Sequence, residues 1–139
     1  MTTADPMETE ISEATIERIV RGFYAKIRLD PDLSPIFERV VQDNWEPHLL
    51  KMMDFWSSVM LKTNRYHGRP MPKHIALTEV RPAHFDRWLA LFRENAREVC
   101  TEDTANRFIE RAELIAESFK LGMFGLPNPN EFPARPAPR

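Results

Sequence analysis

Apolar residues recur at three- and four-residue steps along most of the chain, which is the spacing of one face of an α-helix. Four such stripes are separated by breaks: Ile16, Ile19, Val20, Phe23 and Ile27; His48, Met52, Phe55 and Val59; Phe85, Trp88, Leu89, Phe92, Ala96 and Val99; Ala105, Phe108, Ile109, Ala112, Ile115, Ala116 and Phe119. Segments of alternating polarity, which indicate strands, are few. The pattern therefore predicts an all-helical fold.

Capping and breaking residues predict where these helices begin and end. Ser12 suits the cap of the first helix, and Asp30-Pro31 ends it. Residues 32–37 are too interrupted for a long helix and predict a short helical corner. The other ends follow from the same signals: Asn44 and Leu61 for the second helix, Pro82 for the start of the third, and Thr101 and Gly125 for the two ends of the fourth.

The remaining segments divide the chain into one domain with two appendages. Residues 62–72 predict a loop, and residues 73–77 leave room for one or two helical turns. A chain of 139 residues supports a single core, which we place at residues 12–126. Residues 1–11 are expected to be flexible, and residues 127–139 form a proline-rich tail with too little apolar surface to fold alone.

Charge and cysteine content exclude several kinds of partner. A net charge of -2, with both signs interspersed, gives no broad attraction to nucleic acid or to acidic membranes. Cys100 is the only cysteine, so no intrachain disulfide forms, and its simplest role is that of a small buried apolar residue. No targeting segment or membrane span is evident. We expect a cytoplasmic protein.

Four histidines carry the candidate chemistry: His48, His67, His74 and His84. Motifs for metalloproteases, phosphate loops and nucleophile elbows are absent. A single histidine on an apolar helical face is more often a hydrogen-bonded core residue than a ligand. Here, however, His48 and His74 accompany Tyr24 and Trp88 on the inner faces of different helices, so polar groups converge on an apolar interior.

This arrangement suits a haem. Haem needs an apolar slot, one neutral imidazole on the iron, and hydrogen-bond donors on the opposite side for a gas ligand. Tyr24, Trp88 and His48 offer a phenol, an indole and an imidazole as those donors. His84, which lies four residues before Trp88, is a competing candidate for the iron ligand, although its place near a helix start favours a capping or surface role.

At these residues the sequence resembles the group III truncated haemoglobins. The order and spacing agree over roughly residues 12 to 125. The matching pieces are Phe23-Tyr24, Pro35-Ile36-Phe37, Trp45 with His48, Asp54-Phe55-Trp56, Tyr66-His67-Gly68-Arg69-Pro70, Lys73-His74 and Trp88-Leu89-Ala90-Leu91-Phe92. The glycine pairs typical of the other truncated-globin groups are missing, as the resemblance to group III implies.

The resemblance implies a two-over-two helical sandwich around haem b. It implies His74 as the proximal ligand of a pentacoordinate iron, with Tyr24, His48 and Trp88 around the distal ligand. It also implies apolar haem contacts from Phe37, Met52, Phe55 and Leu77. The propionates need cations or phenols, for which Lys51, Tyr66 and Arg69 are candidates, with a solvated surface role as the alternative for each. His67 is expected to be solvated.

The leading functional hypothesis is a protein that binds oxygen or another diatomic gas, such as carbon monoxide or nitric oxide. The first alternative is a redox enzyme, a nitric oxide dioxygenase or a peroxidase-like enzyme, which takes electrons from a separate reductase because the chain shows no flavin or nicotinamide domain. The second alternative is a haem-free helical interaction protein. We expect a monomer or a weak homodimer.

Overall fold

The computed structural model describes residues 6–68 and 79–125, and its regular structure there consists of helices and one isolated β-bridge. The helices are α1 (Glu13–Leu29), α2 (Ser34–Val41), α3 (Trp45–Leu61), α5 (Pro82–Val99) and α6 (Glu102–Phe124). The predicted all-helical fold is confirmed. The short helix expected at residues 73–77 and the proline-rich tail at 127–139 lie outside the described residues.

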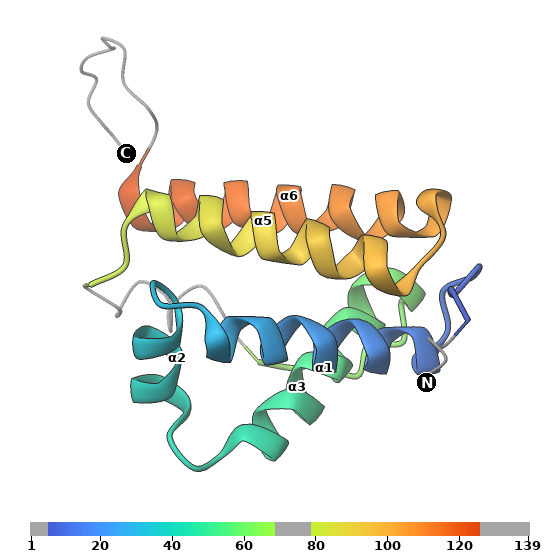
Figure 1. Cartoon of the computed structure of the whole chain (residues 1–139), viewed down its shortest axis with the longest axis horizontal. Helices are drawn as coiled ribbons and strands as arrows, with labels where there is room; N and C mark the ends of the chain where they lie inside the picture. Colours follow the sequence, from blue (N-terminus) through green and yellow to red (C-terminus); the bar gives the residue numbers. More distant parts are fainter. Residues whose placement is uncertain (1–5, 69–78, 126–139) are drawn as a thin grey trace, which may run out of the picture.

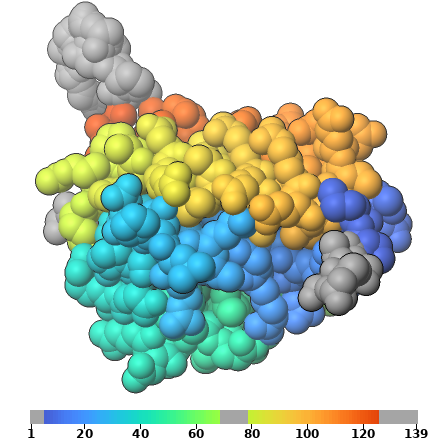
Figure 2. Space-filling model, viewed as in Figure 1, coloured from blue at the N-terminus to red at the C-terminus, as the bar shows by residue number. Residues whose placement is uncertain are grey.

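The helices form two layers. α5 and α6 run antiparallel, side by side, on one side of the molecule, and α1 and α3 lie on the other, with α2 at one end (Figure 1). The surfaces of α1 and α5 meet along much of the length of the molecule (Figure 2). This arrangement is the two-over-two sandwich that the resemblance implied.

Most of the predicted helix ends are confirmed. The Ser12 hydroxyl accepts the Thr15 N–H at 3.1 Å, which caps α1. Pro82 opens α5, and Gly125 follows the last residue of α6 with a φ of 82°. The predicted corner at residues 32–37 differs, because it is a helix of eight residues, Ser34–Val41, whose first turn accommodates Pro35.

Aromatic and branched side chains from both layers make the core. The largest fully buried side chains include Phe23 on α1, Phe92 on α5 and Phe108 on α6. Trp56 of α3 stacks on Phe92 with ring centroids 5.2 Å apart. Each large buried apolar side chain contributes about 1.5 to 3 kcal/mol, so this cluster holds the two layers in one relative placement.

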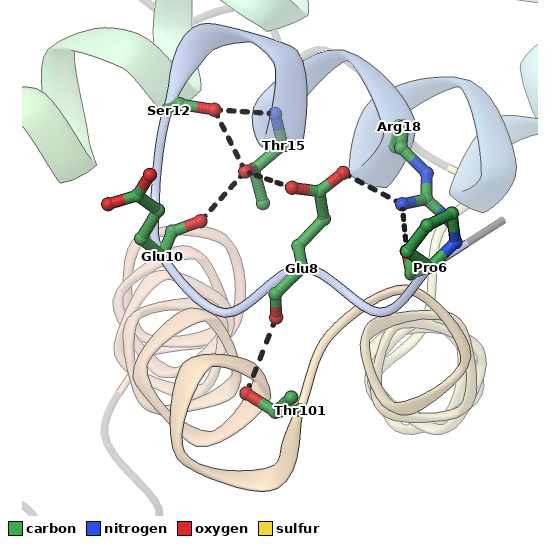
Figure 3. Close-up of polar contacts among 7 residues, drawn as sticks. All are labelled: Pro6, Glu8, Glu10, Ser12, Thr15, Arg18 and Thr101. Carbon is green, nitrogen blue, oxygen red and sulfur yellow. Dashed lines mark hydrogen bonds and ion pairs between the residues drawn. The ribbon is translucent and has the colours of Figure 1, made fainter.

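Hydrogen bonds anchor the segment before α1 at Pro6, through the Arg18 side chain, and at Glu8, through its backbone. This part of the chain differs from the flexible segment that we expected at residues 1–11. The Glu8 N–H donates to the Val99 carbonyl at 2.8 Å, and the Glu8 carbonyl accepts the Thr101 N–H at 2.9 Å. The Thr101 hydroxyl also donates to the Glu8 carbonyl, at 3.3 Å (Figure 3). Thr101 stands at the N-cap of α6 as predicted, but its side chain accepts no N–H of α6 and serves this anchor instead.

Side-chain contacts complete the N-terminal anchor, which we define as Glu8, Thr15, Arg18 and Thr101. The Glu8 carboxylate accepts from Arg18 at 2.7 Å and lies 3.2 Å from the hydroxyl of Thr15 (Figure 3). Thr15 is fully buried, and its hydroxyl also lies 2.8 Å from the Glu10 carbonyl. Every polar side chain of this anchor has a partner, so the anchor joins α1 to the turn between α5 and α6.

Candidate functional site

A cavity of about 540 Å³ lies among α1, α2, α3, α5 and α6. Its size falls within the range of small-molecule and cofactor sites. Its wall contains each predicted site residue of the described ranges: Tyr24, Phe37, His48, Lys51, Met52, Phe55, Tyr66 and Trp88. His74, Arg69 and Leu77 lie outside the described residues. The structure thus brings together side chains that are up to 64 positions apart in the sequence, from Tyr24 to Trp88.

Part of the cavity wall was missed by sequence reasoning. Apolar side chains near the start of α5 and the end of α6 line it together with residues of α2: Ile36, Val40, Val80, Phe85, Ile115, Ala116 and Phe119. Ile36, Val80, Phe85 and Ala116 form a small cluster of buried residues of their own. The stripes signalled only that Phe85, Ile115, Ala116 and Phe119 face inward, because a helical stripe looks the same over a packed core and over a cavity. Val40 and Val80 lie outside the predicted stripes.

His48 lies in the first turn of α3 and presents an imidazole to the cavity. Its ring is perpendicular to the ring of Tyr24, with centroids 5.1 Å apart. Its Nε2 atom is buried and has no hydrogen-bond partner among the residues that the structure describes. Burial, and secondarily the nearby Lys51, lower the pKa of His48, so the imidazole is neutral at pH 7 and carries one N–H.

Tyr24 and Trp88 face the same cavity from α1 and α5. Tyr24 is 7% exposed, and burial raises the pKa of its phenol far above the usual value. The phenol therefore remains protonated at neutral pH and keeps its O–H donor. The Trp88 ring stacks on Phe92 at 5.7 Å and meets the edge of Phe23 at 5.3 Å. An indole N–H can only donate, so both side chains bring donors to the cavity.

The other two described histidines take the places expected from the sequence. The His84 Nδ1 accepts the Arg81 N–H at 2.8 Å, which confirms His84 as a capping residue of α5, although its side chain also lines the cavity. His67 is exposed, as predicted. His84 therefore has a structural use for one of its two ring nitrogens.

Lys51 and Tyr66 line the cavity at positions that reach solvent. Lys51 is exposed, one helical turn after His48. Tyr66 follows α3, where its N–H donates to the Ser58 hydroxyl at 2.9 Å and its ring meets the edge of Phe55 at 5.3 Å. Both side chains offer hydrogen-bond donors near the rim of an apolar cavity.

The wall of the cavity fits a haem in three respects. It is mostly aromatic and aliphatic, it holds a buried imidazole nitrogen without a partner, and within the described residues it contains Lys51 but no carboxylate. A carboxylate there would repel the anionic edge of a haem.

Two other kinds of feature are absent from the described residues. No group of three or more His, Cys, Asp or Glu side chains is gathered as a metal site in the described ranges. None of the described helices is long and apolar enough to cross a membrane.

Comparisons with known proteins agree with this geometry. The sequence model of the bacterial-like globin family matches residues 11–119. A group 3 truncated haemoglobin of Campylobacter jejuni is 34% identical over 113 residues, which cover 79% of this chain and 89% of that protein. The crystal structure of a group III truncated haemoglobin from Campylobacter jejuni superposes with a TM-score of 0.82 at 31% identity, covering 86% of this chain and 96% of the other. The chain therefore belongs to the bacterial-like globin family, as a group III truncated haemoglobin, and the globin family binds haem and diatomic gases.

Proposed function

We propose that the cavity binds haem b with His74 as the iron ligand, and that a diatomic gas binds on the side of Tyr24, His48 and Trp88. A haem held there would supply the iron to which the gas binds. The observation that carries the proposal is the buried His48 Nε2, which has no partner among the described residues in the wall of an apolar cavity. Such atoms are rare in folded proteins and call for an explanation, and a donor reserved for a ligand is one.

Three donors of this chain act on the gas. A ligand whose outer atom acquires negative charge is stabilised by N–H and O–H groups that are already oriented toward it. The Tyr24 phenol stays protonated and the His48 imidazole stays neutral because both are buried. The Trp88 indole is fixed by its stacking on Phe92. These groups slow the release of a polarised gas such as oxygen.

The remaining wall residues hold the macrocycle and keep water out. Phe37, Met52 and Phe55 supply apolar contact, to which we add Leu77. Lys51, Tyr66 and Arg69 are the groups that we propose for the propionates, because cations and phenols donate to carboxylates. An apolar wall strengthens the hydrogen bonds made inside it.

The experiment compares oxygen and carbon monoxide in Tyr24→Phe and Trp88→Phe. Each lost hydrogen bond to a charged acceptor weakens oxygen binding by roughly 1.5 to 3 kcal/mol. This loss corresponds to about one to two decades in affinity, expressed mainly in the dissociation rate. Carbon monoxide carries much less charge when bound, so its dissociation rate should change little. Stopped-flow measurements on both gases give the ratio of the oxygen dissociation rate to the carbon monoxide dissociation rate.

Tyr66→Phe is the matched control, because it removes a phenol that we assign to a propionate and not to the gas, and its haem content is measured separately by the Soret absorbance. Its ratio of oxygen to carbon monoxide dissociation rates should equal that of the unmodified protein. Equal changes for both gases in Tyr24→Phe and Trp88→Phe would mean that these side chains act through shape alone. No change for either gas would refute their assignment as donors.

A further inference from the structure

Trp45 is the first residue of α3 and is held there by two other helices. Its indole N–H donates to Glu38 Oε1 of α2 at 3.2 Å, and the guanidinium carbon of Arg28 of α1 lies 4.4 Å from the ring centroid. Arg28 and Glu38 also pair with each other, Nε to Oε2, at 3.1 Å. Three side chains from three helices thus contact one another pairwise, and the Trp45 ring is only 8% exposed.

The same indole contacts the imidazole of His48. The two rings are perpendicular, with centroids 5.8 Å apart. Tyr24 contacts both of them, with its centroid 5.1 Å from that of His48 and 6.1 Å from that of Trp45. His48 is therefore in contact with two aromatic rings, one of which is fixed at the corner where α1, α2 and α3 meet.

The inward orientation of His48 needs such support. A buried nitrogen without a partner gains hydrogen bonds when its side chain rotates into water. His48 is only partly buried and lies near the start of its helix, so solvent is within reach of this rotation.

Glu38, which accepts the Trp45 indole N–H, is held in its ionised form. The hydrogen bond from Trp45, and after it the pairing with Arg28, outweigh desolvation and hold the pKa of Glu38 below its usual value. Glu38 therefore stays ionised and keeps accepting the indole N–H at neutral pH.

We infer that Trp45 is a positioning residue: fixed by Glu38 and Arg28, it keeps His48 turned into the cavity and so sets the fraction of molecules in which His48 can donate to a gas ligand. The inference rests on the proposed role of His48. Only molecules with His48 turned inward can donate to the gas, so the equilibrium between the inward and outward positions sets how strongly this donor acts on average. Trp45 is therefore a second determinant of gas selectivity, although it is remote from the ligand.

The test uses the full chain loaded with ferrous haem and carbon monoxide. A donor near the ligand strengthens charge transfer to it and lowers the C–O stretching frequency, so inward and outward His48 give separate infrared bands. Trp45→Phe removes the indole N–H and part of the ring. We expect about a tenfold rise in the ratio of outward to inward bands, the effect of one lost hydrogen bond. Because the ferrous carbon monoxide form is diamagnetic, proton contacts between the rings of His48 and Tyr24 can also be followed by NMR and should weaken.

Two carboxylates of this corner provide a matched pair of variants. Glu38→Gln removes the charge that binds Trp45 and Arg28, and should shift the bands in the same direction as Trp45→Phe, by less. Glu46, the residue after Trp45, pairs with Arg21 of α1 at 2.7 Å instead. Glu46→Gln should leave the bands unchanged. His48→Leu supplies the reference spectrum without the imidazole.

The outcomes separate this inference from the proposed function. If His48→Leu shifts the band while Trp45→Phe and Glu38→Gln do not, His48 is a donor but Trp45 does not position it, and the inference is overturned. If Glu46→Gln shifts the bands as much as Glu38→Gln, the effect is a general loosening of the corner, and the inference is again overturned. If His48→Leu leaves the band unchanged, the donor role of His48 in the proposed function fails, and the inference fails with it.

Discussion

Polar groups beside the two halves of α1 are held in opposite conditions. In its first half, Thr15 and Arg18 belong to the N-terminal anchor, where each polar side chain has a partner (Figure 3). In its second half, Tyr24 lies against His48, whose buried Nε2 has no partner in the part of the chain that the structure describes. Both groups of residues are buried or partly buried, so solvent does not explain the difference.

The comparison separates stability from function. A buried polar group with a partner contributes modestly to stability, whereas one without a partner lowers stability by the free energy needed to desolvate it. The N-terminal anchor is therefore expected to stabilise the fold. The cavity end retains a polar atom at a cost in stability, which is expected of a site that meets its partner in a ligand.

The largest effect is expected from His74→Ala, because His74 is the iron ligand that we propose. This change removes the proposed coordinate bond between protein and iron and leaves only apolar and propionate contacts to the haem. Most of the haem should be lost on gel filtration, as measured by the Soret absorbance of the protein peak. His84→Ala is the control and should keep its haem, although it removes a cap of α5. An unchanged spectrum for His74→Ala, together with loss of haem from His84→Ala, would show that the ligand is misassigned.

An intermediate effect, on the free energy of unfolding, is expected from Thr15→Val in the N-terminal anchor and His48→Leu in the cavity wall. The two variants should differ in the sign of this effect. Both remove a polar group and retain an apolar one of similar size. Thr15→Val removes a buried hydroxyl and its hydrogen bonds to partly buried partners, and should lower the free energy of unfolding of the haem-free protein by about 1 to 3 kcal/mol. His48→Leu removes an atom without a partner and should leave this free energy unchanged or raise it. Urea unfolding of the haem-free variants measures both, and a loss of similar size for His48→Leu would contradict the comparison.

The smallest effect is expected at Asp30, which lies at the cavity end of α1 but is fully partnered. Its carboxylate is buried, accepts from Arg87 at 2.7 Å, and also accepts the N–H groups of Leu33 and Asp32. Burial alone would raise the pKa of Asp30, but these hydrogen bonds outweigh it and hold the pKa below its ordinary value of 3.8. The carboxylate therefore contributes stability above that value, which is lost as the pH falls through the lowered pKa.

Asp30→Asn tests this linkage with little change in shape. The variant should be less stable than the unmodified protein at pH 7, and the difference should shrink once the pH falls below the ordinary pKa of the carboxyl. Urea unfolding at a series of pH values measures the difference. A difference that does not depend on pH would mean that Asp30 acts through its shape and its neutral hydrogen bonds.

Local signals in the sequence were sufficient for the helices and for most of their ends. Ser12, Pro82 and Gly125 act within one turn of the chain, through caps, a preset φ and a positive φ. Helical periodicity showed which side chains face inward, and the resemblance named the family. The proposed donors Tyr24, His48 and Trp88, which line one cavity in the structure, were singled out because a polar group on an apolar stripe is conspicuous in a sequence.

Contacts between distant residues were decided only by the tertiary structure. The bond between Thr101 and Glu8 joins residues 93 positions apart, and no local pattern distinguishes it from the helix cap that the sequence predicted. The Trp45 indole finds Glu38 and Arg28 only because three helices meet at one corner. Phe85 lines a cavity although its pattern is that of a core residue. Periodicity specifies which face of a helix is buried, but whether that face meets side chains, a cavity or a distant carboxylate depends on how the helices pack.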